Sequence, residues 1–406
     1  MRVLLLVDSY LPSTKSSARL VHDLAVEFSR QGHDVRLAAP DDSLAGPVET
    51  SRIDGVDVLR VRSPRFKSAA RPLRGFHEAR LSSLLWRRGK RFFREHPCDL
   101  VVYYSPTIFF GPLVRRLKKL WGASSYLILR DIFPQWAVDA GVLRRGRLPW
   151  RYFRRMELLQ YDVADRIGVQ SPANLAYFDE QGWSGKYKLE VLWHWSPSKH
   201  EGLPRTCLRD TLGLAGKTVF FYGGNIGVAQ DMDNVIRLAS SLTDRPDAHF
   251  LLVGEGSEVA RLKESVRSLG LTNVEFHPPL DQARYLATLS EFDIGLITLD
   301  AGLKTQNFPG KMLGYMYFAL PTLASINAGN DLRQVIERNQ AGLVSLNGDD
   351  EAFRNNALKL LDQPELRRRL GTAGREFLET EYSTGRAVRQ IIRGVRPCTI
   401  TSHDCF

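Results

Sequence analysis

The sequence predicts an α/β protein built from two doubly wound domains in tandem. Three observations predict this fold class. Short apolar runs typical of buried strands alternate with amphipathic helical stretches along most of the 406 residues. The alternation stops once, between residues 195 and 206, where Pro197 and Pro204 occur and no apolar period continues. The length also suits two domains of ordinary size, each with its own core.

The first alternating set occupies residues 1–195 and forms an N-terminal domain. Arg2–Val7 is an apolar strand, Ser16–Arg30 is an amphipathic helix closed by Gly32, and Asp34–Ala38 is a second strand. This order makes a parallel unit whose ligand-facing loops follow the carboxyl ends of the strands. Further strands are expected at Val56–Val61, Asp99–Tyr104, Tyr126–Leu129, Arg166–Val169 and Leu189–Trp193, and further helices at Ile108–Leu120, Pro149–Tyr161 and Ala173–Gln181.

The second alternating set occupies residues 205–379 and forms a C-terminal domain. Its strands are separated by helical segments of about 10 to 15 residues. They are expected at Val219–Tyr222, His249–Val253, Val274–Phe276, Ile294–Thr298, Pro321–Ala324 and Leu343–Val344. Residues 365–394 are largely helical in pattern. We expect the helix at about 380–395 to pack back on the N-terminal domain.

The first strand of the second domain and the loop after it lie in residues 219–234, which read VFFYGGNIGVAQDMDN. The apolar start suits a buried strand, and Gly223, Gly224 and Gly227 let the backbone bend sharply and approach a ligand. A helical pattern follows from Val235. Free amides and the positive end of the helix dipole favour an anion at such a helix start, so the loop predicts a phosphate or diphosphate site. A tight connection without a ligand is the alternative.

Two further loops of the second domain should meet this one, because the strands of a parallel sheet end at one edge. They are Gly254–Gly256 and Lys304–Met312. Lys311 begins a helix over residues 311–319 behind a Pro-Gly turn, which places its ammonium to face a diphosphate held by Gly224. A surface lysine is the alternative.

Composition indicates an ordinary globular protein. Hydrophobic residues make up 43% and charged residues 25% of the chain, which are typical globular values. No run of about 18 apolar residues occurs, and the N-terminal apolar stretch is too short for a signal segment. The cysteines have no CxxC spacing and are interpreted as free thiols. They are Cys98, Cys207, Cys398 and Cys405. We therefore expect a cytoplasmic protein.

The net charge of +11 lies entirely in the first half of the chain. Residues 1–190 carry 32 Lys and Arg against 20 Asp and Glu, or +12, whereas residues 191–406 carry 24 against 25, or −1. Arg60–Arg94 holds twelve basic residues and one acid, with large apolar residues interleaved. This composition fits either a basic amphipathic segment on an anionic membrane or a solvated helix face. Nucleic acid is not expected as a partner, because no nucleic-acid-binding motif accompanies the charge.

Several motifs can be taken together. They are Arg30–Val35 (RQGHDV), Arg130–Pro134 (RDIFP), Gly223–Gly227 (GGNIG) with Gln230, Val253–Gly256 (VGEG) and Pro309–Met316 (PGKMLGYM). With them the sequence resembles glycosyltransferase family 4 over nearly its whole length. The resemblance implies the GT-B fold, with two Rossmann-like domains facing a central cleft, and retaining transfer of a sugar. The GNIG and FPGK forms are most similar to the branch that adds N-acetylated hexoses or deoxyhexoses, such as N-acetylfucosamine, to lipid-linked O-antigen or capsule intermediates.

The resemblance implies a nucleotide-diphosphate sugar, UDP-linked, as donor and no cofactor. The donor-binding residues that it implies are Gly224, Asn225, Gln230, Glu255, Gln306 and Lys311. Many family members have Arg and Lys where Asn225 and Gln230 stand. The family's paired glutamates would fall on Gln306 and Gly314, so both carboxylates are missing. Lys311 is therefore expected to supply most of the positive charge on the diphosphate.

On the acceptor side, the resemblance implies a lipid-linked saccharide or glycan and a peripheral position on the inner face of the cytoplasmic membrane. Asp131 is the candidate catalytic residue, with a helix cap as the alternative role. In the family mechanism the departing phosphate oxygen takes the acceptor proton, so the protein needs mainly to stabilise the diphosphate. Asp231 and Asp233 form a DxD, a metal-binding pattern in the other large glycosyltransferase fold. At a helix start these acids are ordinary capping residues, so no metal is expected.

Two other functions remain open. A nucleotide-sugar epimerase of the same fold would carry an acidic catalytic pair, and no such pair can be placed in this sequence. A non-catalytic protein that binds nucleotide sugars would keep the fold without the paired glutamates. Slow donor hydrolysis by the purified protein would separate an enzyme from such a binding protein.

Overall fold

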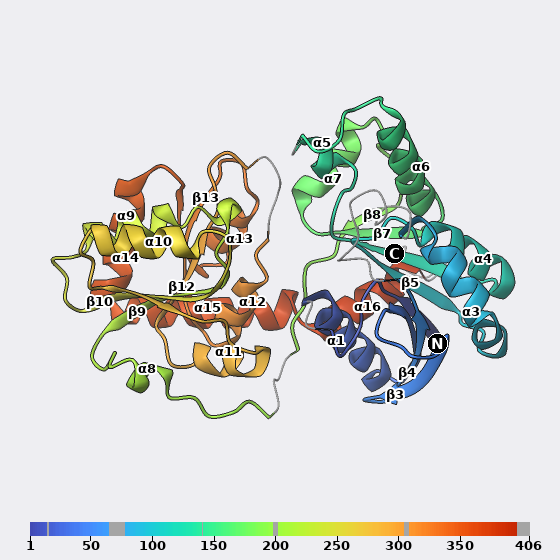
Figure 1. Cartoon of the computed structure of the whole chain (residues 1–406), viewed down its shortest axis with the longest axis horizontal. Coiled ribbons are helices and arrows are strands. Elements are labelled where there is room, and N and C mark those ends of the chain that lie inside the picture. Colours follow the sequence, from blue (N-terminus) through green and yellow to red (C-terminus); the bar gives the residue numbers. More distant parts are fainter. Residues whose placement is uncertain (14–15, 65–77, 140, 198–201, 304–307, 396–406) are drawn as a thin grey trace, which may run out of the picture. The chain divides into compact units, whose positions relative to one another are not determined.

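The computed structural model describes residues 1–13, 16–64, 78–139, 141–197, 202–303 and 308–395 (Figure 1). The chain divides into two compact units. Unit 1 comprises Met1–Pro197 together with Thr384–Phe406, and unit 2 comprises Ser198–Ser383. Unit 1 is therefore made from two stretches of chain that are far apart in the sequence.

Unit 1 is built on an eight-stranded sheet with the order β3-β4-β2-β1-β5-β6-β7-β8. Its strands are β1 (Arg2–Leu6), β2 (Asp34–Asp41), β3 (Val48–Ile53), β4 (Val56–Arg62), β5 (Leu100–Ser105), β6 (Ser124–Leu129), β7 (Arg166–Val169) and β8 (Leu189–Val191). All neighbouring strands are parallel except β3, which pairs antiparallel with β4. The parallel order predicted for this half of the chain is therefore confirmed.

Helices cover both faces of this sheet, because successive side chains of a buried strand point to opposite faces. Leu4 and Leu6 of β1 belong to one core cluster, and Val3 and Leu5 belong to another. The first cluster includes side chains of α3, α4, α6 and α7, and the second includes side chains of α1 and α16. The helices are α1 (Ser16–Arg30), α3 (Leu81–Glu95), α4 (Gly111–Trp121), α5 (Gln135–Asp139), α6 (Leu148–Asp162), α7 (Pro172–Glu180) and α16 (Thr384–Val395).

The last helix, α16, belongs to unit 1 although it follows unit 2 in the sequence. Gln390 Nε2 donates to the Val191 carbonyl at 2.8 Å, and Arg166 Nε donates to the Gly394 carbonyl at 2.8 Å. Val388 and Ile391 are fully buried in the same cluster as α1. In Figure 1, α16 is drawn in red beside α1 of unit 1.

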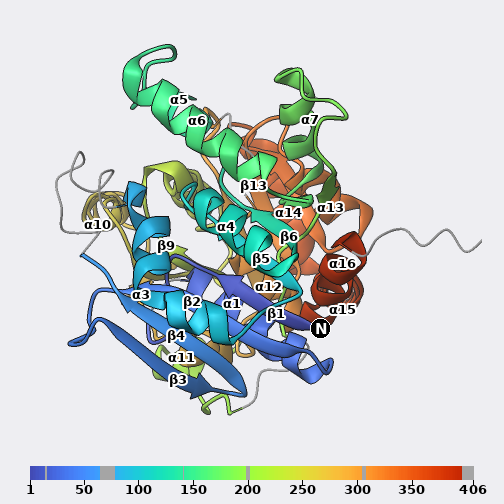
Figure 2. The same ribbon diagram turned by 90° about the vertical axis from the view of Figure 1, so that its right-hand side faces the viewer.

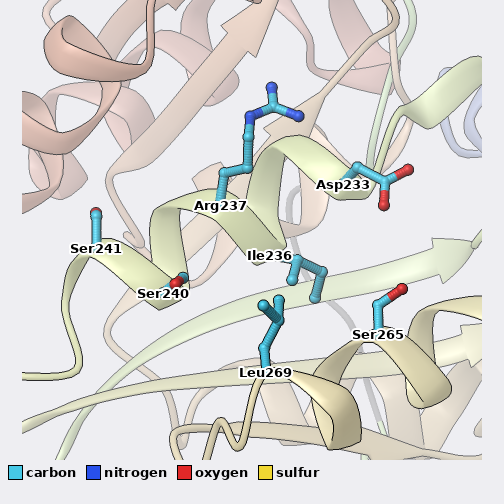
Figure 3. A pocket seen from close by; sticks show the side chains of 7 residues that line it. All are labelled: Asp233, Ile236, Arg237, Ser240, Ser241, Ser265 and Leu269. Carbon is cyan, nitrogen blue, oxygen red and sulfur yellow. The ribbon is translucent and has the colours of Figure 1, made fainter.

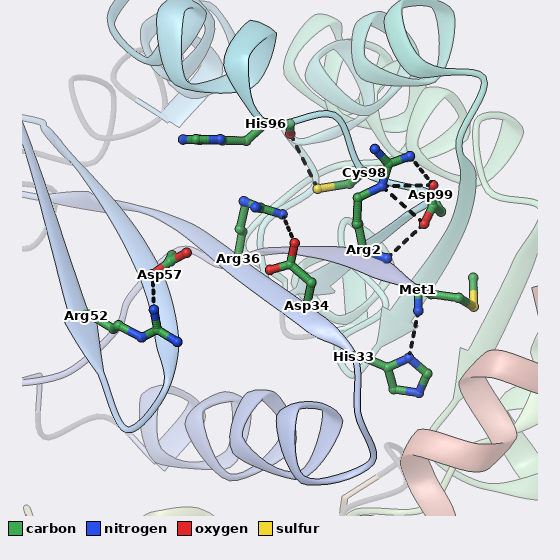
Figure 4. Close-up of polar contacts among 10 residues, drawn as sticks. All are labelled: Met1, Arg2, His33, Asp34, Arg36, Arg52, Asp57, His96, Cys98 and Asp99. Atoms are coloured by element: carbon green, nitrogen blue, oxygen red, sulfur yellow. Dashed lines mark hydrogen bonds and ion pairs between the residues drawn. The ribbon is translucent and has the colours of Figure 1, made fainter.

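Charged side chains occupy the amino-terminal edge of this sheet (Figure 4). Arg2 at the start of β1 bonds to Asp99 before β5, with its backbone amide at 2.8 Å from one carboxylate oxygen and its guanidinium at 2.5 Å from the other. Arg36 and Asp34 pair on β2 at 2.8 Å. These contacts fix the beginnings of the strands, while the loops at the opposite, carboxyl edge carry the residues expected to bind ligands.

Unit 2 contains a six-stranded parallel sheet with the order β11-β10-β9-β12-β13-β14. Its strands are β9 (Thr218–Asn225), β10 (Ala248–Glu255), β11 (Val274–His277), β12 (Ile294–Thr298), β13 (Thr322–Ile326) and β14 (Gly342–Leu346). Its helices are α8 (Leu208–Thr211), the 3₁₀ turn η1 (Val228–Gln230), α9 (Asp233–Ser241), α10 (Val259–Ser268), α11 (Gln282–Leu289), α12 (Lys311–Tyr317), α13 (Leu332–Arg338), α14 (Asp350–Asp362) and α15 (Pro364–Glu381). All six strands expected in this half of the chain are present.

The basic segment Arg60–Arg94 differs from its predicted role in one respect. Residues 65–77 lie outside the described part of the chain, and α3 accounts for most of the remainder. Leu81, Leu85 and Phe93 of α3 are at most 2% exposed and belong to the core of unit 1. These three side chains therefore do not enter a membrane, and for α3 they favour the second of the two alternatives, a solvated basic helix face. Within the described ranges, no helix is both long and apolar enough to cross a bilayer.

Glu157 on α6 is a buried acid that should make the stability of unit 1 depend on pH. Its carboxylate accepts hydrogen bonds from Arg154 at 2.7 Å and from Tyr161 at 3.0 Å. Burial raises the pKa of Glu157 from 4.5 to about 7, against the opposing effect of Arg154. Between these two values the folded protein holds a proton that the unfolded chain has released. This contribution to stability is present at low pH and is lost as the pH rises through 7.

Glu157→Gln should therefore become more stable relative to the wild type as the pH rises. We expect the difference in unfolding free energy to change by roughly 2 to 3 kcal/mol between about pH 5 and about pH 8. Urea unfolding of both proteins across this range measures it. Glu180→Gln, at an exposed position on α7, is the matched control and should run parallel to the wild type. Parallel curves for Glu157→Gln would show that the carboxyl group is already ionised at low pH.

Candidate active site

Gly224, near the end of β9, lies beside Gly254, near the end of β10, in the parallel pairing of these two strands. Gly224 has a φ of +128° and Gly254 a φ of +153°, both in the region that favours glycine. A Cβ atom on Gly254 would lie 1.9 Å from the Gly224 carbonyl oxygen. The Ile226 amide donates to the Glu255 carbonyl at 2.8 Å. The ends of the two strands are thus held together backbone to backbone, which leaves no room for a side chain between Gly254 and Gly224.

Lys311, the first residue of α12, reaches this pair of strand ends. Its Nζ atom lies 3.3 Å from the centre of the Tyr222 ring, and a Cβ atom on Gly224 would lie 3.6 Å from it. Desolvation lowers the pKa of Lys311 well below its ordinary value. Among the described residues, no ion pair includes Lys311. A diphosphate at this position would supply a negative counter-charge to this partly buried amine.

Asn225 and Gln230 contact each other across the turn. The amide nitrogen of Asn225 donates to Gln230 Oε1 at 2.8 Å, and the Gly227 amide donates to the same oxygen at 3.2 Å. The Tyr222 hydroxyl donates to the Asn225 carbonyl at 2.5 Å. These bonds hold the shape of the turn. The positive charge beside Gly224 comes from Lys311.

The helix start differs from the one expected. The 3₁₀ turn Val228–Gln230 precedes α9, and the first amides of such a turn have no partner within it. Asp233 lies in the first turn of α9 and pairs with Arg261 at 2.6 Å, whereas Asp231 ends the 3₁₀ turn and accepts from Asn347 at 2.8 Å. The start of α9 therefore carries a carboxylate already paired with Arg261, which disfavours an anion at that helix start.

A cavity of about 230 Å³ adjoins the turn after β10. Glu255 is exposed and contributes to its wall. The cavity is lined by Gly254, Glu255, Gly256, Val259, Lys263, Phe276, His277 and Pro278. Sequence reasoning missed Lys263, Phe276 and His277, although the end of β11 lies beside the end of β10 and so belongs to the same edge. Of the other predicted residues, Gln306 lies outside the described residues.

A second hollow of about 540 Å³ lies between α9 and α10, away from the glycine turns (Figure 3). Ile236 of α9 and Leu269, just after α10, face each other across it, while Arg237 points away. Arg237 is paired with Asp350 at 2.9 Å. The charged groups around this hollow are thus already compensated, and it adds nothing to the chemistry of the glycine turns.

In unit 1, Asp131 follows the end of β6 at the carboxyl edge of the sheet. It is exposed, whereas the preceding Arg130 is buried and donates to the Leu192 carbonyl at 2.7 Å and the Trp193 carbonyl at 3.1 Å. Partial desolvation and the nearby Asp8 carboxylate raise the pKa of Asp131, and Arg130 opposes them. Asp131 thus presents a carboxylate at the edge where a parallel sheet binds its ligands.

Comparison with known proteins identifies the family to which this chain belongs. Residues 17–192 match the description "Glycosyl transferase 4-like domain", and residues 205–377 match "Glycosyl transferases group 1". The chain is 26% identical to "Probable glycosyltransferase WbjE" of Pseudomonas aeruginosa over 289 residues, covering 69% of this chain and 70% of that protein. It is 26% identical to "Putative colanic acid biosynthesis glycosyl transferase WcaI" of Escherichia coli over 309 residues, covering 73% and 74%.

A solved structure has the same fold. The Anabaena protein Alr3699/HepE in complex with UDP superposes with a TM-score of 0.67 at 15% identity, covering 97% of this chain and 99% of that one. At this identity the likeness shows the fold alone. The two family matches together span both units of the chain. The protein therefore has the GT-B fold and belongs to glycosyltransferase family 4, as a glycosyltransferase.

Proposed function

We propose that the protein is a retaining glycosyltransferase that takes an N-acetylated hexose or deoxyhexose from a UDP-sugar. The acceptor is a lipid-linked saccharide or glycan in bacterial surface polysaccharide synthesis. The observation that supports the donor most directly is the position of Lys311 over Tyr222 and against Gly224. A partly buried amine beside a glycine-rich strand end suits a diphosphate, and HepE, which shares the fold, has been solved with UDP.

The cavity beside the diphosphate position suits the nucleoside. It adjoins Gly254 and Gly256, so a nucleotide with its phosphates at Gly224 would have its base within reach of Phe276 and His277. The apolar wall suits a base, and the polar groups on the rim can select it. The donor residues are then Gly224, Lys311 and Glu255, with Asn225 and Gln230 shaping the turn and Gln306 proposed from the family resemblance.

The transfer step follows from this placement of the diphosphate. The acceptor hydroxyl oxygen forms a bond to the anomeric carbon on the face from which the diphosphate departs, and the bond from that carbon to the phosphate oxygen breaks. The hydroxyl proton passes to the departing phosphate oxygen. Lys311 stabilises the charge that develops on the diphosphate. Asp131 orients the acceptor hydroxyl as the proposed catalytic residue of unit 1.

The experiment is a screen of UDP-sugars with a short-chain lipid-linked acceptor, measuring UDP release and the coupled product. We expect product to form only when both substrates are present, and at an unchanged rate in chelator. Asp233 is paired with Arg261 and Asp231 with Asn347, so the transfer is proposed to need no divalent metal. Loss of activity in chelator that manganese restores would contradict this assignment.

The same screen separates the alternatives. An epimerase would convert the donor without acceptor, and the new sugar would remain on UDP. A non-catalytic binding protein would show a thermal shift with UDP-sugar and release no UDP. Either result would replace the proposed activity. The proposed position of the protein is the inner face of the cytoplasmic membrane, which the lipid-linked acceptor and the excess charge of unit 1 support.

A further inference from the structure

An exposed apolar patch lies in unit 1 between α5 and the second turn of α6. Leu148 is 80% exposed, Val142 is 56% exposed and Tyr152 is 42% exposed. Among the described residues only eight large hydrophobic side chains are this exposed, and three of them fall within these eleven positions. Scattered exposed hydrophobics are normal, but a group of this kind marks a contact surface.

The same segment is strongly basic. Its exposed arginines are Arg144, Arg145, Arg147, Arg151 and Arg155. No acidic residue occurs between Asp139 and Glu157. None of these five arginines takes part in an ion pair with another described residue. We call residues 142–155 the arginine–leucine segment. It combines unpaired positive charge with apolar side chains that project into solvent.

The inner side of the arginine–leucine segment is firmly anchored. The Phe153 ring lies 5.0 Å from that of Phe133, centre to centre, and 6.4 Å from that of Phe109. Arg154, the basic residue that faces inward, bonds to Glu157 and to the Tyr177 hydroxyl of α7. The exposed side chains are thus held on a fixed base, and their exposure does not result from a missing partner inside the unit.

The segment also lies close to Asp131. Phe133, against which it packs, is two residues after Asp131, and both follow the end of β6. The α5–α6 region belongs to the carboxyl edge of the unit 1 sheet, where it is drawn in green (Figures 1 and 2). A surface bound to the arginine–leucine segment would therefore lie beside the proposed acceptor position.

We infer that the arginine–leucine segment docks on an anionic lipid bilayer, with Leu148 and Val142 entering the interfacial region and the arginines binding lipid phosphates. The inference rests on the proposed function, in which the acceptor is lipid-linked. Docking on the bilayer would bring that acceptor to Asp131. Charge complementarity and the projecting apolar side chains favour a bilayer over a nucleic acid. Both partners offer phosphates to the arginines, but only the bilayer also offers an apolar region in which the exposed leucine and valine can be buried. α3 offers mainly charge, since Leu81, Leu85 and Phe93 lie in the core and its other large apolar side chains are packed against that core.

The test is co-sedimentation of the full chain with vesicles of phosphatidylcholine alone or mixed with phosphatidylglycerol. One variant changes Arg144, Arg145, Arg147 and Arg151 to glutamine, and a second is Leu148→Ser. The matched control changes Arg87, Arg88, Lys90 and Arg91 of α3 to glutamine and removes the same charge. We expect the first variant to lose about tenfold or more in binding to the anionic vesicles and the α3 variant to lose far less. Leu148→Ser should weaken binding at high salt, where the charge is screened.

Equal losses from the two charge variants would overturn the inference, because they would show a general effect of net charge. Unchanged binding in the arginine variant, or binding to an RNA oligonucleotide but not to vesicles, would overturn it as well. Transfer to a water-soluble acceptor is measured in parallel. Normal transfer, together with vesicle binding that the substitutions in the arginine–leucine segment do not change, would refute the docking surface and leave the proposed function standing. Vesicle binding that depends on the segment, without any transfer, would refute the proposed function and leave the docking surface intact.

Discussion

Asp131→Asn should lower the rate of sugar transfer by about two orders of magnitude, the loss that a poorly oriented reacting group can cause. Asparagine keeps the shape of the side chain and removes its charge. Asp131 is exposed after the end of β6, and the buried Arg130 before it fixes the backbone through the Leu192 and Trp193 carbonyls. The substitution therefore leaves the fold in place and changes the carboxylate alone.

Donor affinity separates a catalytic role from a structural one. Asp131 is in unit 1 and the proposed donor turns are in unit 2, so the dissociation constant for UDP-sugar should not change. Product formation under saturating donor and acceptor gives kcat, and calorimetry gives the donor affinity. Glu180→Gln is the control, because that acid is exposed on α7. A normal kcat in Asp131→Asn would assign Asp131 a capping role before α5.

Lys311→Met should weaken UDP-sugar binding by roughly 1.5 to 3 kcal/mol, the range for a hydrogen bond to a charged group. Methionine retains the apolar contact with the Tyr222 ring and removes the amine that lies 3.3 Å from its centre. Titration calorimetry measures the loss. Lys359→Met on α14, where the lysine is exposed, is the matched control. Equal affinities for wild type and Lys311→Met would remove this lysine from the donor site.

Proton uptake should accompany donor binding to the wild type. Desolvation lowers the pKa of Lys311 in the empty protein, and a bound diphosphate restores the charged form by its negative charge. The pKa thus rises on binding, so affinity increases as the pH falls towards the pKa of the empty protein. Calorimetry in buffers of different ionisation enthalpy detects the proton, and Lys311→Met should abolish the difference between buffers.

The sequence predicts those parts of the fold that depend on local patterning. The strands of both sheets were recognisable because they are apolar and short, and the loops at their carboxyl ends contain the site residues. β3 was missed: its residues Val48–Ile53 are mostly polar and only partly buried. A usable signal was present, because Asp54 and Gly55 both have positive φ in the tight turn to β4, and Asp-Gly is typical of such hairpins.

Contacts between side chains were beyond prediction. That Asn225 bonds to Gln230, or that Tyr222 lies beneath the Lys311 amine, depends on how two turns meet in space. The basic helix α3 shows the same limit in another form. An amphipathic pattern gives the spacing of apolar residues and does not tell whether they face a core or a lipid surface. For α3, the burial of Leu85 and Phe93 shows that these residues face the core. For the arginine–leucine segment, the exposure of Leu148 shows that this residue faces away from the core.

Unit 1 consists of two stretches of chain that are far apart in the sequence. During synthesis, unit 1 can therefore be completed only after unit 2 has been made. The ribosome makes residues 1–197, then all of unit 2, and only afterwards α16. Until α16 emerges, the sheet face covered by α1 lacks Val388 and Ile391, and the Val191 carbonyl lacks its bond from Gln390. Nascent unit 1 therefore carries an open apolar face while unit 2 is translated and folds, and the helix that closes this core leaves the ribosome only after unit 2.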